Sequence, residues 1–397
     1  MYILYCRTFQ LIMKLANYFL GYRTPETITG EGSLSNLPAK ISELNLNNVL
    51  VVTDNKLLSL GILDNFFLKL KEENIKYAVF SDIMPNPTDE DVENGFKIFK
   101  DNNATVIVAI GGGSPMDCAK AIAAKNAHPN KPISKLQGIL KVHKKIVPFF
   151  AVPTTAGTGS ETTVAAVITE KKTHHKASIN DPAILPKYCV LDPLLTVGLP
   201  PMITATTGLD ALCHAVESYT NYTYTTPLER EYSKKAVKLI YENLLKAYEN
   251  GSDIEARQNM QLAAFYAGRS FTRGCVGYVH AIGHTLGGLY SLAHGMAMSI
   301  ILPHVLRAYG TATYKRLAEL AEVCGFSGDE ETKTIKFIEW IEQCKAKMGI
   351  PEGLNMIKEE DIDKIINWAI KEANPLYPVP VIWKYKEFET VIRSMMK

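Results

Sequence analysis

The segment TVIVAIGGGSPMDCAKAIAA (105–124) joins an uninterrupted apolar run to a glycine turn and an alanine-rich stretch. An apolar run without polar alternation is typical of a strand that is buried on both faces, as in a parallel sheet. The residues after the turn predict a helix, because Pro115 lies near the first helical position, where proline is favoured. The segment therefore predicts one strand–turn–helix unit of an α/β fold.

The same alternation is repeated along the first half of the chain. Further strands are predicted at residues 48–54, 76–82 and 147–153. Helices are predicted at 56–72 and at 88–102, the second with Thr88 as its N-cap. Residues 164–192 are expected to form short strands and loops. Strands that alternate with helices in this way predict a parallel sheet.

The pattern changes near residue 200, and every element predicted beyond it is a helix. The predicted helices are Ala211–Tyr219, Leu228–Glu249, Asp253–Phe271, Val279–Thr285, Met296–Ala308, Lys315–Val323, Lys333–Met348, Glu360–Ala373 and Lys386–Met396. We therefore predict an α/β domain over residues 1–199, with 1–20 a possible extension of it, and an all-α domain over 200–397. A ligand site is expected in the cleft of such a two-domain chain.

The composition excludes several classes of protein. Formal net charge is only +2 over 397 residues, which indicates no strong attraction to nucleic acid or to an anionic membrane. No segment reaches the ~20 uninterrupted apolar residues of a membrane span. The seven cysteines are scattered and never form a CxxC pair, a pattern typical of a reduced compartment, so we expect a cytoplasmic protein.

Two histidine-containing segments, TGLDALCHAVE (206–217) and GYVHAIGHTLGGLYSLAHG (277–295), indicate a metal site. Asp210 and His214 are four residues apart, as are His280 and His284, so each pair projects from one face of its helix. We expect the glycine pair 287–288 to end the second helix, so that His294 precedes the next one. Such pairs can also be ordinary helix-surface contacts. Several of them on apolar, small-residue helices favour iron(II) or zinc.

Two polar stretches at predicted strand ends favour a dinucleotide. GGGS (111–114) opens a helix, where backbone N–H groups and the helix dipole can hold a diphosphate. PTTAGTGSETT (153–163) adds hydroxyl groups at the end of another strand. Each stretch alone can be a simple polar turn, and neither is the GxGxxG fingerprint. Together they predict a cofactor-binding edge.

From about Tyr22 onward the chain resembles the iron-containing (group III) alcohol dehydrogenases. The matching motifs are PNPT (85–88), GGGSPMDCAK (111–120), PTTAGTGSE (153–161), LDP (191–193), PPMITATTGLDALCHAVE (200–217) and GYVHAIGHTLGGLYSLAHG (277–295). The resemblance implies the dehydroquinate synthase-like fold, a homo-oligomer that is a dimer or larger, and an NAD(P)-dependent enzyme. The implied reaction is reversible hydride transfer between a small primary alcohol or diol and NAD.

The resemblance also implies roles for single residues. Asp210, His214, His280 and His294 would bind iron(II) or zinc, and His284 would lie beside the nicotinamide as a catalytic residue. Phe271 falls where family members line the substrate pocket. The implied cofactor-binding residues are Asp54, Gly112, Gly113, Ser114, Asp117, Thr154, Thr155, Thr158 and Lys176.

Two rival enzymes share the implied fold. A dehydroquinate synthase-like lyase needs several basic residues around its substrate, whereas Arg273 is the basic residue near the predicted site. A glycerol dehydrogenase-like enzyme leaves His214 without a role. NAD is expected rather than NADP, because Asp54 would repel a 2′-phosphate.

Overall fold

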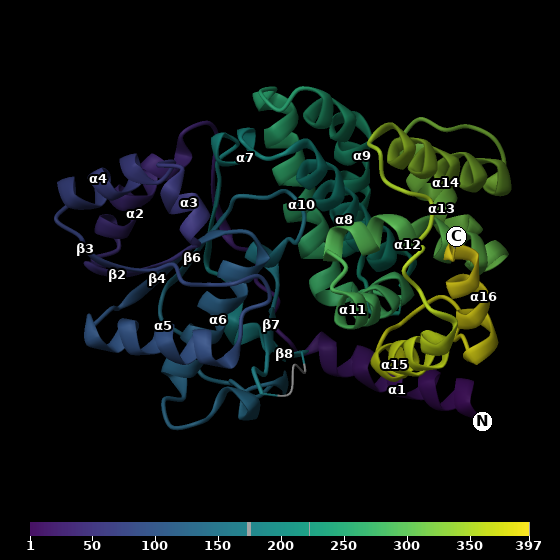
Figure 1. The fold of residues 1–397 in the computed structure, drawn as a ribbon, viewed down its shortest axis with the longest axis horizontal. Coiled ribbons are helices and arrows are strands. Elements are labelled where there is room, and N and C mark those ends of the chain that lie inside the picture. The colour runs from purple at the N-terminus through teal and green to yellow at the C-terminus, as the bar shows by residue number, and fades with distance from the viewer. Residues whose placement is uncertain (173–175, 222, 397) are drawn as a thin grey trace. The chain divides into compact units, whose positions relative to one another are not determined.

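The computed structural model describes residues 1–172, 176–221 and 223–396, and the chain divides into two compact units. One unit is Gly21–Gly198, and the other joins Met1–Leu20 to the residues from Leu199 onward. The first unit contains the parallel sheet and the second is built from helices (Figure 1).

The α/β unit is organised around a six-stranded sheet in the order β1-β9-β6-β4-β2-β3. All neighbouring strands in it are parallel; Val49 pairs with Val106, and Ala109 pairs with Ala151. The strands are β1 (Glu26–Thr29), β2 (Asn48–Val52), β3 (Lys76–Phe80), β4 (Val106–Gly111), β6 (Phe149–Pro153) and β9 (Tyr188–Leu191). The predicted parallel sheet is confirmed.

Helices cover both faces of this sheet, which explains why its strands read as continuous apolar runs. Val49 and Val51 pack into one core cluster, whereas Leu50 and Val52 pack into the other. The first cluster contains residues of α2 (Leu37–Glu43) and α4 (Asp64–Glu72). The second contains residues of α5 (Asp89–Asp101) and α6 (Gly113–Ala127), which lie on the opposite side of the sheet in Figure 1.

A smaller sheet has the order β5-β8-β7, with β7 and β8 antiparallel. Its strands are β5 (Gly138–Ile139), β7 (Ala165–Thr169) and β8 (Lys176–Asn180). β7, β8 and β9 thus lie in the region 164–192, where short strands were predicted. A short helix, α7 (Leu194–Val197), ends the unit.

Two helix predictions in this unit have different outcomes. Thr88 caps α5 as predicted, in a reciprocal capping box with Asp91. The single helix predicted over 56–72 is wrong, because the chain forms α3 (Asn55–Ser59) and then α4. Gly61 separates the two helices with a φ of +68°, a conformation that glycine adopts without strain.

The helical unit is built around α8 (Pro201–Thr220), which packs against α9 (Pro227–Glu249) and α10 (Ile254–Gly274). α8 begins ten residues earlier than predicted, with proline in its first turn. A Cβ at Gly208 would lie 2.4 Å from Leu244, so glycine allows α8 its close approach to α9. The other helices are α11 (Tyr278–Tyr290), α12 (His294–Tyr309), α13 (Tyr314–Val323), α14 (Glu330–Lys347), α15 (Ile362–Ala373) and α16 (Tyr385–Met395).

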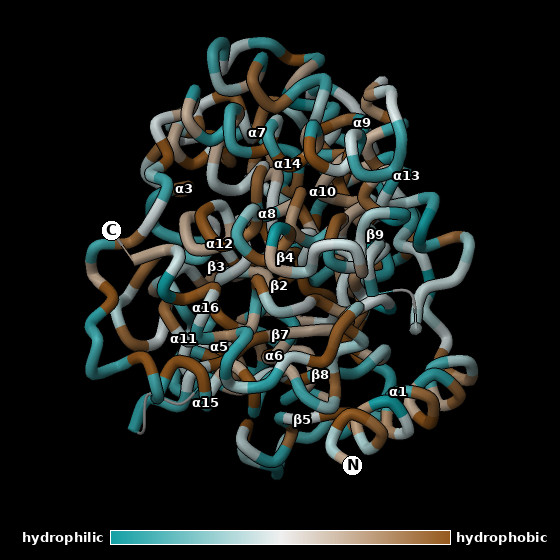
Figure 2. Tube along the Cα trace, turned by 90° about the vertical axis from the view of Figure 1, so that its right-hand side faces the viewer, coloured by the Kyte–Doolittle hydropathy of each residue, from teal (hydrophilic) through white to brown (hydrophobic). Residues whose placement is uncertain are grey.

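The first twenty residues belong to the helical unit and not, as expected from sequence, to the α/β part. They form α1 (Tyr2–Tyr18), in which Gln10 is fully buried. Gln10 donates to the carbonyl oxygens of Pro375 (3.2 Å) and Tyr377 (2.7 Å), and Arg7 donates to two carbonyl oxygens further along. Many exposed residues of α1 are apolar, among them Leu4, Leu11 and Leu15, and brown segments mark this helix in Figure 2.

None of the helices in the described residues is long and apolar enough to cross a membrane.

We expect Gln10→Ala to lower the free energy of unfolding by about 1–3 kcal/mol, because two partly buried carbonyl oxygens would lose their donor. Lys14→Ala, on the exposed side of the same helix, should change it by less than about 0.5 kcal/mol. Urea unfolding followed by circular dichroism measures both. Equal stability of Gln10→Ala and the parent protein would contradict the anchoring role of α1.

Candidate metal and cofactor sites

Four metal-ligating side chains converge in the helical unit from three helices. α8 contributes Asp210 and His214, α11 contributes His280, and α12 contributes His294 as its first residue. One ligand atom from each of the four lies within 4.8 Å of all the others. Asp210 Oδ1 lies 3.8 Å from the Nε2 atoms of His214 and His280 and 3.2 Å from that of His294. The structure thus brings together all four predicted ligands.

The cluster fits a metal ion, because its burial leaves polar atoms without partners. Asp210, His214 and His280 are buried, whereas the side chain of His294 is 42% exposed. Asp210 Oδ1 and His280 Nε2 make no well-formed hydrogen bond to any described residue. A buried carboxylate oxygen without a donor is costly. A divalent cation would compensate both atoms at once.

The protonation states also suit metal ligation. Burial lowers the pKa of His214 to about 3 and that of His280 well below its usual value. Both imidazoles are therefore neutral at pH 7, the form that binds metals. Burial alone would raise the pKa of Asp210, but the surrounding imidazoles outweigh it and the net shift is downward. Asp210 is thus an anion, the form in which a carboxylate binds a metal.

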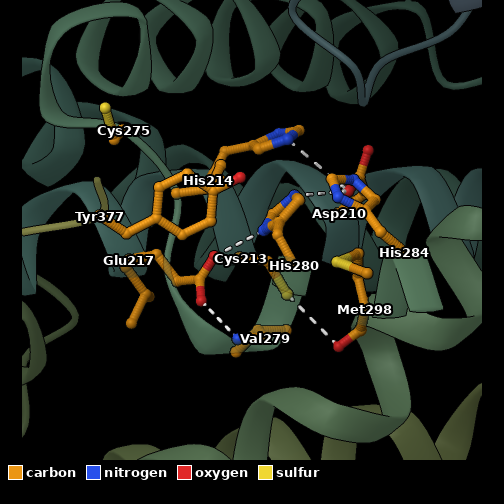
Figure 3. A network of polar contacts seen from close by, with 12 residues as sticks. Asp210, Cys213, His214, Glu217, Cys275, Val279, His280, His284, Met298 and Tyr377 are labelled. Atoms are coloured by element: carbon orange, nitrogen blue, oxygen red, sulfur yellow. Dashed lines mark hydrogen bonds and ion pairs between the residues drawn. The ribbon is translucent and has the colours of Figure 1, made fainter. Parts of the chain in front are cut away.

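Glu217 orients His280 and was not anticipated from the sequence. Its Oε2 lies 2.5 Å from His280 Nδ1, and its Oε1 accepts a hydrogen bond of 2.7 Å from Val279 N (Figure 3). Burial raises the pKa of Glu217 to about 7, while backbone N–H donors, Gly277 among them, oppose the shift. With Nδ1 engaged, Nε2 is the nitrogen that faces Asp210. The spacing in the sequence could have indicated this role, since Glu217 is seven residues after Asp210 and lies on the same helix face.

The glycine pair 287–288 does not end the helix that carries His280, contrary to the prediction. α11 continues through it to Tyr290, and Ser291 follows with a left-handed φ of 54°. Glycine in a helix costs only about 1 kcal/mol relative to alanine, which packing against α12 and α15 can offset. The turn needed to bring His294 back is therefore made at 291–293.

His284 lies beside the cluster rather than in it. Its ring stacks on that of His294 with centroids 5.3 Å apart, and its side chain is 42% exposed. His284 Nδ1 lies 2.7 Å from Glu372 Oε1 on α15. Phe271, the predicted pocket residue, stacks on His214 with ring centroids 4.1 Å apart. Both residues thus adjoin the predicted ligands.

In the α/β unit, the predicted cofactor residues follow three adjacent strands. Asp54 comes after β2, Gly112 and Gly113 follow β4, and Thr154 comes after β6. Because these strands are parallel neighbours, their carboxyl ends share one edge of the sheet, where α/β proteins bind ligands. Asp54 Oδ1 also caps α3, accepting a hydrogen bond from Leu57 N.

The two glycine-containing loops contact each other at this edge. Thr154 N donates to Gly111 O at 3.1 Å. A Cβ at Gly113 would lie 3.2 Å from Thr158, and one at Gly112 would lie 3.6 Å from Thr155. Gly112 is the N-cap of α6 and has no side chain to cover the helix N-terminus. The backbone N–H groups of a helix N-terminus without a side-chain cap suit a diphosphate.

Asn86, for which no role was predicted, connects two of the predicted cofactor-binding residues. Asn86 N donates to Ser114 Oγ (3.3 Å), and Lys176 Nζ donates to Asn86 Oδ1 (2.8 Å). Asn86 has a φ of +62°, which asparagine tolerates better than most residues. Burial lowers the pKa of Lys176. The position of Asn86 within the PNPT motif (85–88) was the feature of the sequence that could have indicated this role.

Asp117 and Lys120 of α6 hold the second of these loops, residues 153–163, in place. Asp117 accepts hydrogen bonds from Ser160 Oγ (2.9 Å) and Val167 N (3.0 Å), so its carboxylate supports the loop. Lys120 is fully buried, and its Nζ lies 2.6–3.1 Å from five oxygen atoms of Ser160, Thr163 and Ala165. Burial lowers its pKa to about 8. A fully paired interior ammonium of this kind holds the loop in one position.

Comparison with known proteins gives matches over nearly the whole chain. A family model described as iron-containing alcohol dehydrogenase matches residues 24–193, and one for the C-terminal part of that family matches 204–396. The chain is 37% identical over 364 residues to the NAD-dependent methanol dehydrogenase of Bacillus methanolicus, covering 90% of this chain and 94% of that protein. It is 36% identical over 376 residues to the 1,3-propanediol dehydrogenase of Citrobacter freundii, covering 93% and 94%.

A solved structure is similar over the same length. The crystal structure of a 1,3-propanediol oxidoreductase superimposes with a TM-score of 0.91 at 34% identity. The match covers 95% of this chain and 100% of the other. The predicted fold class is confirmed by this agreement.

We expect Glu217→Gln to weaken zinc binding roughly 10–100-fold, as removal of a ligand's outer partner does in other metal sites. An amide can still accept from Val279 N, but it holds the imidazole of His280 less firmly. Competition between the metal-free protein and a chromophoric chelator measures the dissociation constant. Glu231→Gln, at an exposed position of α9, is the matched control. Equal zinc affinity of Glu217→Gln and the parent would contradict the orienting role.

Proposed function

The chain belongs to the iron-containing alcohol dehydrogenase family and is an NAD(P)-dependent alcohol dehydrogenase, and we propose that the Asp210 cluster holds its catalytic metal ion. The supporting observation is the convergence of four ligand atoms within 4.8 Å, two of which are buried and make no well-formed hydrogen bond to a described residue. Alcohol-dependent formation of reduced nicotinamide, measured with and without a metal chelator, tests the proposal. Activity that survives complete removal of the metal would contradict it.

Iron(II) is the metal we propose, with zinc as the alternative. One carboxylate and three imidazoles suit a borderline divalent ion, and no described cysteine belongs to the cluster. When bound, the ion would supply Lewis acidity that makes a substrate hydroxyl easier to deprotonate. Metal analysis of protein purified without oxygen distinguishes the two metals.

The α/β unit would bind the cofactor through its two loops. The backbone N–H groups at Gly112, Gly113 and Ser114 would hold the diphosphate. The hydroxyl groups of Thr154, Thr155 and Thr158 would line the rest of the cofactor, together with Lys176. Asp54 would accept hydrogen bonds from the adenosine ribose, which favours NAD over NADP. The carboxylate of Asp117 would act mainly by holding the second loop.

We propose a small primary alcohol or diol as the substrate. The named activities of two similar proteins, with methanol and with 1,3-propanediol, support this size class. The ring of Phe271 against His214 would give the substrate carbon chain an apolar surface next to the cluster. Seven free cysteines support a reduced compartment such as the cytoplasm. A homo-oligomer stays a prediction.

His284 is proposed to transfer the proton of the substrate hydroxyl. It adjoins His294 and is accessible, and imidazole is suited to accept and release protons near neutral pH. When bound, the nicotinamide cofactor would supply the hydride acceptor. His284 would thus handle the proton while the four ligands orient the oxygen.

The proposal predicts opposite effects of two histidine substitutions on one helix. His280→Ala should lose metal and activity together, because it removes a ligand. His284→Ala should keep near-stoichiometric metal and lower kcat about 10²-fold, as for loss of an acid–base group. Metal content by mass spectrometry and steady-state kinetics measure both. Loss of metal in His284→Ala with retention in His280→Ala would reverse the assignment.

For the cofactor, we expect the parent protein to have a higher kcat/KM with NAD than with NADP. Asp54→Gly should reduce this preference at least ~10-fold, because it removes the carboxylate that repels a 2′-phosphate. Glycine costs a helix N-cap only a few tenths of a kcal/mol, so α3 should persist. Asp64→Gly, at the first residue of the following helix α4, is the control and should leave the preference unchanged. An equal or higher kcat/KM of the parent with NADP would contradict the assignment.

A further inference from the structure

Glu372, for which no role was predicted, contacts both His284 and Tyr377. Its Oε1 lies 2.7 Å from His284 Nδ1 and accepts a hydrogen bond of 2.9 Å from the hydroxyl of Tyr377. His284 is on α11, whereas Glu372 is one residue before the end of α15. The contact therefore depends on the packing of α15 against α11.

The chemistry of Glu372 determines which nitrogen of His284 carries a proton. Burial alone would raise the pKa of Glu372, but His284 and Tyr377 outweigh it and the net shift is downward. Glu372 is therefore a carboxylate at neutral pH, and a carboxylate can only accept hydrogen bonds. His284 must then donate from Nδ1, which makes Nε2 the acceptor nitrogen of the neutral ring.

The N-terminal helix α1 anchors the segment that carries Tyr377, the second partner of Glu372. Burial raises the pKa of Tyr377 well above its usual value, so its hydroxyl keeps the proton it donates. Gln10 of α1 binds the carbonyl oxygens of Pro375 and Tyr377, and Arg7 binds those of Val379 and Pro380. The segment that presents the phenol is thus anchored at four carbonyl groups.

We propose that Glu372, supported by Tyr377, is a positioning residue that holds His284 in one ring orientation with Nδ1 as the donor nitrogen. The inference rests on the proton-transfer role proposed for His284. Without the carboxylate, the imidazole can rotate and adopt either tautomer, so only a fraction of molecules would present Nε2 correctly. Glu372 itself touches neither substrate nor cofactor in this role.

A double-mutant cycle tests whether Glu372 acts through His284. We expect Glu372→Gln to lower kcat at least ~10-fold while leaving metal content and the KM for NAD unchanged, and Tyr377→Phe to lower kcat less. In a His284→Ala background, Glu372→Gln should cause no further fall, because the two residues act as one unit. Asp363→Asn is the matched control, since Asp363 on the same helix also accepts from a tyrosine, Tyr385. It should leave kcat unchanged.

A spectroscopic measurement gives a readout apart from activity. In zinc-loaded protein with ¹⁵N-labelled histidine, the signals of His284 are those absent from His284→Ala. We expect them to show a protonated Nδ1 in the parent protein and a tautomer mixture in Glu372→Gln. If the contact between Glu372 and His284 served only stability, Glu372→Gln would lower the melting temperature without changing these signals or kcat.

The outcomes separate this inference from the proposed function. If His284→Ala keeps full kcat, the proton-transfer role fails first. If His284→Ala loses activity but Glu372→Gln does not, only the positioning role of Glu372 is overturned. An equal fall in kcat on adding Glu372→Gln to His284→Ala would also overturn it, since Glu372 would then act by another route.

Discussion

The buried carboxylate of Asp210 is the constraint on which the helical unit depends. One of its oxygens faces three imidazole nitrogens and has no well-formed hydrogen bond within the described part of the chain. An ionised carboxylate is costly in an apolar interior unless a cation compensates it. The proposed cation would supply this compensation, since α8, α11 and α12 bring side chains that could ligate it to this oxygen from distant parts of the chain. Metal binding and folding of this unit should therefore be coupled.

Two carboxylates divide the work of two histidines that lie four residues apart on one helix. Glu217 engages Nδ1 of His280, which is buried and contributes to the cluster. Glu372 engages Nδ1 of His284, which is accessible and lies outside the cluster. The same type of contact would thus serve the proposed metal ligand in one case and the proposed acid–base group in the other. The difference arises from the helix that supplies the carboxylate, α8 or α15.

In the α/β unit, hydrogen bonds within the protein hold both glycine-containing loops in place. Lys120 and Asp117 hold the second loop from α6, and Thr154 N bonds to Gly111 O of the first. Both loops therefore belong to one rigid edge of the sheet, which leaves backbone N–H groups at the start of α6 to hold a ligand. Preorganisation of this kind reduces the entropy lost when a flexible dinucleotide binds.

The sequence by itself determined the parallel sheet, the change to helices near residue 200, both glycine loops and the four clustered ligands. These features depend on local periodicity and spacing, or on motifs that identify the family. Only the tertiary structure decided that α1 belongs to the helical unit, that Lys120 is buried among five oxygen atoms, and that Glu217 contacts His280 whereas Glu372 contacts His284. Spacing on one helix treats those histidines as equals. Their difference depends on contacts between residues 63 and 88 positions apart, which no local pattern encodes.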